Sequence, residues 1–182
     1  FGSLPRADDV ALNQDADTVP LKPKVVALVS INGGVGRSTL ATALSSGLQR
    51  QGESVVALDL DPQNALHLHF GVSPALPGIG RTSLEHGPWS PLQQLSFAGC
   101  QVIPFGDTDT QQRENLQRWL KRDSNWLAQR LSTLGLTERH TLIIDTPAGN
   151  NVYSQQALSV ADVVVVVAQA DAASLGTLDQ LD

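Results

Sequence analysis

A glycine-rich loop near the start of the chain joins a predicted strand to a predicted helix and restricts the folds open to the sequence. Residues 25–30 read Val-Val-Ala-Leu-Val-Ser, which is typical of a buried strand, and residues 31–39 read Ile-Asn-Gly-Gly-Val-Gly-Arg-Ser-Thr. Glycines allow successive backbone N–H groups to surround phosphate oxygens, and the N-terminus of the following helix favours negative charge. This order of strand, glycine loop and helix predicts a phosphate-binding loop.

The ends of this loop depart from the general phosphate-binding pattern, which begins with Gly and ends with Lys followed by Ser or Thr. Ile31 stands in the first place and Arg37 in the lysine place, whereas Ser38 retains the hydroxyl that binds Mg²⁺. We therefore expect the loop still to surround phosphate, and the exchanged cation makes hydrolysis the open question.

Three aspartates follow predicted strands: Asp59 and Asp61 end one strand, and Asp145 ends another. Ligands of doubly wound folds gather at the carboxyl ends of strands, so these carboxylates would converge beside Ser38 and contact a phosphate-bound Mg²⁺. The alternative is that these aspartates cap helices or turns. For Asp61, which precedes Pro62, a turn role and a catalytic role can coexist.

Strand and helix signals alternate from residue 24 onward. Strands are predicted over residues 25–30, 54–60, 100–104, 140–145 and 162–168, helices over 38–51, 111–134 and 152–159, and a last helix from about residue 172. Residues 72–98 are rich in Pro, Gly and Ser and are predicted to be irregular with short helices. The alternation and the near-continuous Val, Ile and Leu of the strands predict a doubly wound α/β fold, with a mainly parallel sheet covered by helices on both faces.

The helix predicted over residues 111–134 is amphipathic. Its apolar residues recur at helical spacing: Leu116, Trp119, Leu120, Trp126, Leu127, Leu131 and Leu134. We expect its tryptophans to be core or interface anchors. The polar run Asp123-Ser124-Asn125 could interrupt this helix.

Composition narrows the functional classes. The chain has a net charge of −6 and no cluster of Lys or Arg, which argues against nucleic-acid binding. The longest apolar run, 163–168, is too short to cross a bilayer, and the single cysteine, Cys100, excludes an intrachain disulfide and fits a reducing cytoplasm.

Residues 1–23 are expected to form an extended or disordered tail before a domain over 24–182. Because the chain begins with Phe1 and has no Met, we expect it to be a fragment of a longer polypeptide.

Two other kinds of site find little support. A dinucleotide loop needs a third glycine where the chain has Thr39, although Asp59 stands at a distance suited to a ribose contact. The four histidines have no Cys or acidic framework suited to zinc, and Cys100 is predicted to be a packed thiol. The tandem hydroxyls after Arg37 and the strand ending at Asp145 fit triphosphate–Mg²⁺ chemistry better.

Three motifs carry a resemblance to a known family. Residues 32–39 resemble the deviant Walker A motif of the MinD/ParA ATPases, residues 58–63 (Leu-Asp-Leu-Asp-Pro-Gln) its first switch, and residues 143–149 (Ile-Ile-Asp-Thr-Pro-Ala-Gly) its Walker B and second switch. By these motifs the chain is identified as a member of that superfamily. The resemblance implies a MinD-like (SIMIBI) P-loop NTPase fold, with the C-terminal part of the family fold missing.

Within this superfamily the chain is similar to the BcsQ-type (YhjQ) proteins of bacterial cellulose-synthase operons. Residues 66–72, 103–106, 112–119 and 168–178 carry this similarity. It implies a cytoplasmic regulatory or scaffold subunit that binds ATP and Mg²⁺, forms a homodimer, and reaches the inner membrane through its partners. Those partners are other cellulose synthase subunits, a small operon-encoded protein among the candidates. A partition or division-site ATPase is the alternative subfamily.

The resemblance also implies roles for single residues. The phosphates would be held by Gly33, Gly34, Val35, Gly36, Arg37, Ser38 and Thr39. Ser38 would bind Mg²⁺ directly and Asp145 through water, with Asp59 supporting the metal side. Asp61 would orient or activate the attacking water, and Gly149 would offer its N–H toward the γ-phosphate.

Two cation positions of the family are altered here. The signature lysine, which reaches the partner's nucleotide in a face-to-face dimer, falls on Asn32, and the P-loop lysine falls on Arg37. Arginine can neutralise phosphate with a different reach, whereas Asn32 has no charge to give. Loss of one such cation removes roughly 10³–10⁵ in rate, so we expect ATP binding with slow or absent hydrolysis. An active ATPase that drives a localisation cycle and a nucleotide-free interaction module are the alternatives.

Overall fold

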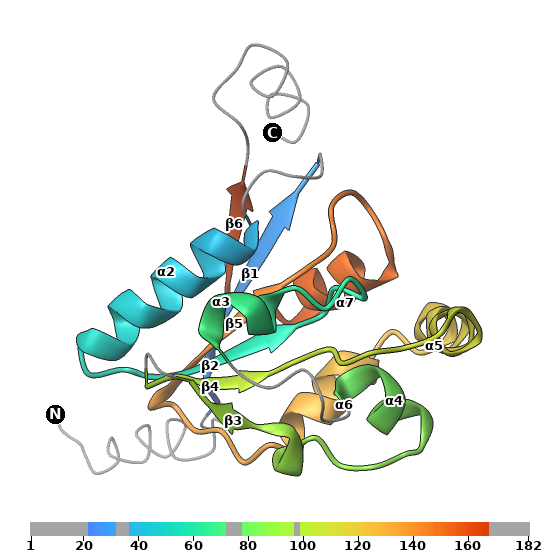
Figure 1. The fold of residues 1–182 in the computed structure, drawn as a ribbon, viewed down its shortest axis with the longest axis horizontal. Helices are drawn as coiled ribbons and strands as arrows, with labels where there is room; N and C mark the ends of the chain where they lie inside the picture. Colours follow the sequence, from blue (N-terminus) through green and yellow to red (C-terminus); the bar gives the residue numbers. More distant parts are fainter. Residues whose placement is uncertain (1–21, 32–36, 72–77, 97–98, 168–182) are drawn as a thin grey trace, which may run out of the picture.

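The structure is a computed structural model that describes residues 22–31, 37–71, 78–96 and 99–167. Its strands are β1 (Lys24–Ser30), β2 (Ser54–Asp59), β3 (Gln94–Leu95), β4 (Gln101–Ile103), β5 (His140–Asp145) and β6 (Val163–Val167). They form one sheet in the order β3-β4-β2-β5-β1-β6, as Figure 1 shows. Every pairing is parallel except that of β3 with β4. The predicted doubly wound, mainly parallel sheet is confirmed.

Helices cover both faces of this sheet (Figure 1). They are α2 (Arg37–Arg50), α3 (Leu66–Phe70), α4 (Ile79–Leu84), the 3₁₀ turn η1 (Ser90–Leu92), α5 (Thr110–Arg122), α6 (Trp126–Ser132) and α7 (Val152–Val160). Successive side chains of a strand point to opposite faces, so β1 divides its side chains between two cores. Val26 and Leu28 pack with α2 and α3, whereas Val25 and Ala27 share a core with α4 to α7.

The helix predicted over 111–134 is divided into α5 and α6 at the predicted polar run. Asp123 ends α5 in an extended conformation, and its carboxylate accepts the N–H of Asn125 at 3.1 Å. The buried amide of Gln156 on α7 donates to the carbonyls of Leu120 and Asp123 and accepts the N–H of Leu127. A side chain from a later helix therefore satisfies the backbone groups that the break exposes.

The tryptophans are core anchors, as predicted. Trp126 is buried and meets the buried Trp89 edge-on, with ring centroids 5.3 Å apart. Trp119 is partly buried and packs against the same core. Since burial of a large aromatic ring contributes strongly to stability, these rings fix α5 and α6 against the sheet.

Two short elements were not predicted. One is α3, and the other is the antiparallel strand β3, which pairs with β4 through two residue pairs. Backbone contacts rather than apolar periodicity position the segment that begins at Gly78, between these two elements: Ile79 and Gly80 donate their N–H groups to the carbonyls of Pro104 and Phe105. At Gly78 a Cβ would lie 2.3 Å from the Phe105 carbonyl carbon, so only glycine fits. The predicted last helix and residues 1–21 of the predicted tail lie outside the described residues.

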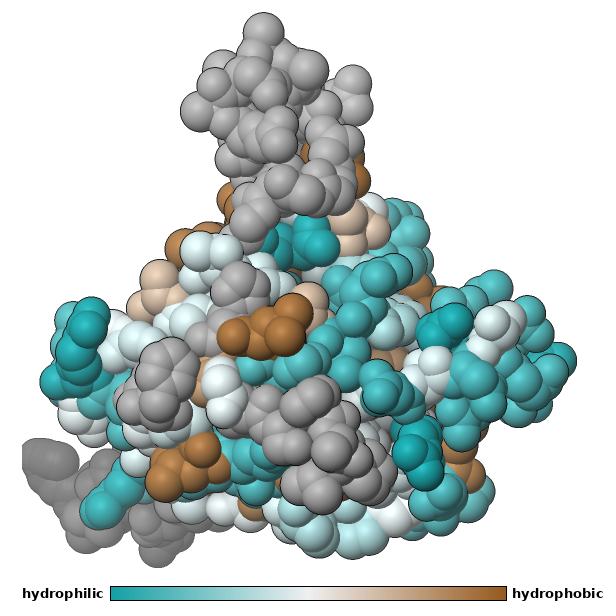
Figure 2. All heavy atoms as spheres, viewed as in Figure 1, coloured by the Kyte–Doolittle hydropathy of each residue, from teal (hydrophilic) through white to brown (hydrophobic). Residues whose placement is uncertain are grey.

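The surface is mostly hydrophilic on the side where α5 lies, as Figure 2 shows, and its hydrophobic residues form small separate groups. The large exposed apolar side chains among the described residues are Leu68, Leu95, Leu158, Val163, Val164 and Val166. Within the described residues, no helix has the length and apolar character needed to span a membrane.

Candidate functional site

The strand order brings the predicted acidic residues to one edge of the sheet. β5 lies between β1 and β2, and its last residue, Asp145, is in register with Asp59 of β2 and Leu28 of β1. The carboxyl ends of these parallel strands therefore meet beside the start of α2. This is where ligands bind in doubly wound folds.

Ser38 pairs directly with one of these acids. It lies in the first turn of α2, and its hydroxyl donates to Oδ2 of Asp145 at 2.7 Å. Asp145 is almost fully buried, with 1% of its side chain exposed. The predicted loop residues Asn32, Gly33, Gly34, Val35 and Gly36 lie outside the described residues, and Thr39 follows in α2 with an exposed side chain.

Arg37 lies among the carboxylates. Its Nε donates to the carbonyl of Thr146 at 2.7 Å, and its guanidinium also donates to the Ser30 hydroxyl. The same side chain approaches two acids, with 3.8 Å from Nη2 to Asp61 Oδ2 and 3.8 Å from Nε to Asp145 Oδ1. Only 12% of the Arg37 side chain is exposed. From the sequence alone, Arg37 is expected to contact phosphate. Its contacts with the acidic residues of the site were not predicted.

Asp59 is occupied by backbone contacts. One of its carboxylate oxygens accepts the N–H of Asp61 at 2.9 Å, and the other accepts the N–H of Leu66 at 3.3 Å. Burial, and then the nearby charge of Asp145, raise the pKa of Asp59 well above its usual value. Asp59 therefore caps a turn and also lies close to Asp145. A contribution of Asp59 to metal binding stays a prediction.

Asp61 likewise combines a turn contact with a place at the site. Its Oδ1 accepts the N–H of Gln63 at 3.0 Å, while its Oδ2 faces Arg37. The first predicted switch is therefore held in a turn. The Asp61 carboxylate in this turn points to Arg37, as the Asp145 carboxylate does.

The second predicted switch is bound to β1. The Thr146 hydroxyl donates to the carbonyl of Leu28 at 2.8 Å, and the N–H of Gly149 donates to the carbonyl of Ser30 at 2.7 Å. Gly149 has a φ of +85°, a conformation that favours glycine. Its predicted contact with a γ-phosphate would require this N–H to leave Ser30.

Asn151 holds the same loop from the other side. Its Nδ2 donates to the carbonyls of Pro147, Ala148 and Gly149, over 3.1 to 3.3 Å. Its Oδ1 accepts the N–H of Ser154 and so caps α7. One side chain therefore couples the second switch to the start of a helix.

A pocket of about 540 Å³ opens at this edge of the sheet. It is lined by Arg37, Asp61, Pro62, Gln63, Arg113, Gln117, Pro147, Ala148, Asn151 and Tyr153. The motifs supply the switch residues, but Arg113, Gln117 and Tyr153 come from α5 and α7 and were missed. No local signal marks them, because their place depends on how these two helices pack.

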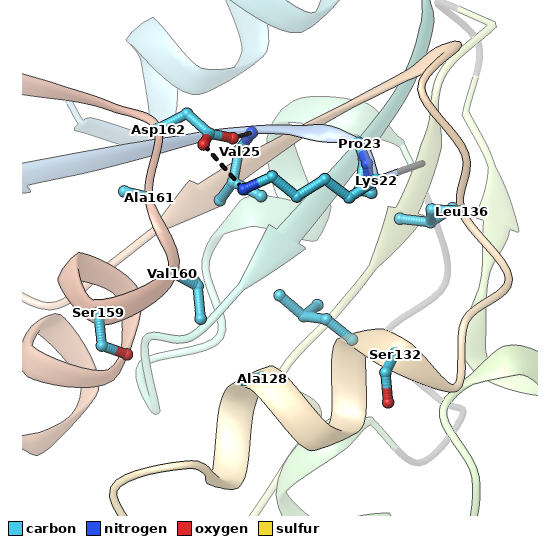
Figure 3. A pocket seen from close by; sticks show the side chains of 11 residues that line it. Lys22, Pro23, Val25, Ala128, Ser132, Leu136, Ser159, Val160, Ala161 and Asp162 are labelled. Carbon is cyan, nitrogen blue, oxygen red and sulfur yellow. Dashed lines mark hydrogen bonds and ion pairs between the residues drawn. The ribbon is translucent and has the colours of Figure 1, made fainter. Parts of the chain in front are cut away.

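A second pocket, of about 520 Å³, lies at the opposite, amino edge of the sheet (Figure 3). Lys22 and Val25 line it beside Asp162, whose carboxylate binds both of them. Apolar side chains from α6 and α7 form much of its wall, including Leu131 and Val160. None of the three motifs reaches this pocket, so it is not a candidate for the phosphate chemistry.

The donors at the carboxyl edge fit Mg²⁺. Ser38 and Asp145 supply hard oxygen atoms within hydrogen-bond distance of each other. Among the described residues no cluster of three or more His, Cys, Asp or Glu could hold a metal. Mg²⁺ at nucleotide sites takes one or two protein ligands and completes its shell with phosphate and water, so two such oxygen atoms suffice.

Known proteins are similar to this chain in sequence. A family model described as cellulose biosynthesis protein BcsQ matches residues 23–182. The cellulose biosynthesis protein BcsQ of Escherichia coli (strain K12) is 31% identical over 150 residues, which cover 81% of this chain and 60% of the relative. The chromosome partitioning protein ParA of Caulobacter vibrioides (strain NA1000 / CB15N) is 31% identical over 169 residues, covering 87% and 60%.

A solved structure has the same fold. The cobyrinic acid a,c-diamide synthase from Mycobacterium smegmatis, with bound ATP analogue and magnesium, superposes with a TM-score of 0.71. It is 22% identical, and the match covers 87% of this chain and 67% of that one. At this identity the likeness establishes the fold alone. The chain spans about 60% of the length of the curated relatives it matches. By its three ordered motifs, its sheet and the matching family model, the chain belongs to the BcsQ family of cellulose biosynthesis proteins, within the MinD/ParA-type P-loop ATPases.

Proposed function

We propose that this protein binds ATP and Mg²⁺ as a regulatory or scaffold subunit in bacterial cellulose synthesis. The observation that supports this most is the Ser38–Asp145 hydrogen bond of 2.7 Å beside Arg37, at the carboxyl edge of the sheet. A helix-start hydroxyl and a strand-end carboxylate are the protein groups that hold Mg²⁺ at triphosphate sites.

The residues of the three motifs would have separate roles at such a site. Ser38 would bind Mg²⁺ directly, Asp145 through water, and the glycine loop with Arg37 would surround the phosphates. When bound, Mg²⁺ would neutralise the phosphate charge. Asp61, fixed by its turn contact with Gln63, would orient the water nearest the terminal phosphate.

Turnover is expected to be slow or absent. Arg37 contacts Asp61 and Asp145 at 3.8 Å each, so it must exchange carboxylates for phosphate when nucleotide enters. Asn32 offers no charge to a partner's nucleotide. The nucleotide would then order the two switches rather than drive repeated cycles.

We infer the partners from the family. The relatives named cellulose biosynthesis proteins support association with other cellulose synthase subunits. A homodimer supported by nucleotide, and a place at the inner membrane through those partners, complete the proposal. The ParA relative favours a second candidate, an ATPase that drives a localisation or partition cycle.

Nucleotide binding and single-turnover phosphate release by the purified protein separate these candidates. We expect ATP to bind with little phosphate released, and the double variant Asn32→Lys plus Arg37→Lys to gain turnover. Turnover by the unsubstituted protein at an ordinary kinase-like rate of about 1–100 s⁻¹ would favour the active ATPase. Failure of ATP to bind would contradict the proposal and favour an interaction module without nucleotide.

A further inference from the structure

A second arginine lines the pocket beside the candidate phosphate site. Arg113 lies on α5, outside all three motifs, yet it shares the pocket with Arg37 and Asp61. The same pocket is bordered by both switch segments, at Pro62 and Pro147. Arg113 is therefore a cation that lines the same pocket as Arg37 and both switch segments.

The bonds of Arg113 leave its charge uncompensated. Its Nη1 donates to the carbonyl of Thr108 at 2.6 Å and approaches the Thr108 hydroxyl at 3.4 Å, and its Nη2 lies 3.5 Å from the Thr110 hydroxyl. These partners are neutral oxygens, and across the described part of the chain no carboxylate forms an ion pair with Arg113. In this it differs from Arg37, which already faces two carboxylates.

Tyr153 adds a hydrogen-bond donor to the same wall. Tyr153 is 2% exposed, and its buried hydroxyl lies near the side chain of Gln117 without a hydrogen bond of ordinary geometry among the described residues. Burial raises the pKa of Tyr153 to about 12, while the neighbouring Gln117 and Arg113 act to lower it. The hydroxyl thus keeps its proton at neutral pH and can donate a hydrogen bond to an anion.

We propose that Arg113 and Tyr153 form a subsite for the terminal phosphate of ATP. An arginine without a carboxylate partner, next to a buried donor hydroxyl, suits a phosphate oxygen. Arg113 thereby supplies from the same chain a positive charge that Asn32 cannot supply across a dimer. This inference rests on the proposed function, and it assigns to Arg113 the discrimination of ATP from ADP.

Calorimetric titration with MgADP and with a magnesium-bound, non-hydrolysable ATP analogue tests the subsite. Arg113→Gln should weaken binding of the ATP analogue about 10- to 100-fold, because a charge-assisted hydrogen bond is lost. Binding of MgADP should change less than about twofold, because ADP lacks the terminal phosphate. Arg118→Gln, which removes an exposed arginine of the same helix, should leave both affinities unchanged.

Tyr153→Phe gives a second test that preserves the packing of the ring. It should weaken binding of the ATP analogue by about threefold to tenfold and spare MgADP. Equal losses for both nucleotides in these variants, or no loss in either variant, would overturn the subsite while leaving the proposed function intact. If the unsubstituted protein binds neither nucleotide, the proposed function is contradicted and the subsite falls with it.

Discussion

Arg37 shows how one altered residue changes the electrostatics of the whole site. Its guanidinium lies between Asp61 and Asp145 and is tied to Ser30 and the Thr146 carbonyl. A planar fork can make these contacts at once, whereas an ammonium offers a single point of charge. In the absence of nucleotide, Arg37 therefore stabilises the folded protein by compensating buried carboxylates.

This leads to a prediction for stability without nucleotide. Arg37→Ala should lower the free energy of unfolding by about 2–4 kcal/mol, because Asp145 is left buried without its cation. Arg37→Lys should lose less, about 1–2 kcal/mol, since charge remains but the bonds to Thr146 are weakened. Urea denaturation measures both values. Arg50→Ala, in the exposed last turn of the same helix, should change stability by less than about 0.5 kcal/mol.

For single residues, the sequence predicted which residues lie at the site better than it predicted their contacts. The motifs indicated that Ser38 and Asp145 would meet, and the structure brings their side chains to 2.7 Å. The turn contacts of Asp59 and Asp61 were weighed as alternatives. The position of Arg37 could not be read from the motif, because it depends on carboxylates that arrive from two distant strands.

Among the secondary-structure elements, α7 is the one most closely linked to the site. Its N-cap, Asn151, closes a capping box with Ser154 and binds three carbonyls of the second switch. The helix start and the switch loop therefore share one side chain. A conformational change in the loop would therefore alter the cap of α7, and loss of the cap would alter the loop.

Asn151→Ala is therefore expected to have two effects. It should lower the free energy of unfolding by about 1–2 kcal/mol, the usual cost of a lost N-cap. It should also speed amide hydrogen exchange at Ala148 and Gly149, because the carbonyls of residues 147–149 lose a common donor. Asp109→Ala removes the capping box of α5 and should have a similar effect on stability. If exchange at Ala148 and Gly149 responded equally to both variants, the coupling through Asn151 would be wrong.

The elements themselves were predictable where local pattern decides them. The apolar runs of β1, β2 and β5 were found to within one residue at each end. The two-residue strand β3 carries too little pattern to be seen, since it is formed by pairing with β4. The break between α5 and α6 was suspected from Asp123, but its stabilisation by Gln156 is a contact across 33 residues.

Across the whole molecule, the sheet separates two ends with different chemistry. The carboxyl edge holds the switches and the paired acids, and the amino edge holds the pocket of Figure 3. At the amino edge Asp162 accepts the Val25 N–H at 2.9 Å, and Val25 accepts the Asp162 N–H at 2.8 Å. These bonds join the loop before β6 to the start of β1.

Asp162 should make stability depend on pH in a defined direction. The Val25 N–H, and then Lys22, hold the pKa of Asp162 below its ordinary value of 3.8. A carboxyl group whose pKa is lower in the folded than in the unfolded protein stabilises the folded state. This stabilisation is fully present above the unfolded-state pKa and is lost as pH falls through the folded-state pKa. Asp162→Asn should thus destabilise the protein by about 1 kcal/mol at neutral pH and progressively less below pH 3.8. Urea denaturation across this range measures the difference, and a difference that grew as pH fell would contradict it.

The alternation of strands and helices was enough to predict the class of fold. Strand order was not predicted, because it follows from which faces the helices cover. The pocket shared by Arg113 and Arg37 is a property of that order, since α5 reaches the site only through its packing against α7 and the sheet.

Magnesium dependence of ATP binding probes the paired hydroxyl and carboxylate at the centre of this site. Calorimetry on the purified chain should show ATP binding that needs Mg²⁺. Ser38→Ala should weaken it at least about tenfold, because one hydroxyl contact to the metal is lost. Ser46→Ala, farther along the same helix, should leave it unchanged. Binding that is absent, or that is indifferent both to Mg²⁺ and to the loss of the Ser38 hydroxyl, would contradict the assignment of this edge as an ATP–Mg²⁺ site.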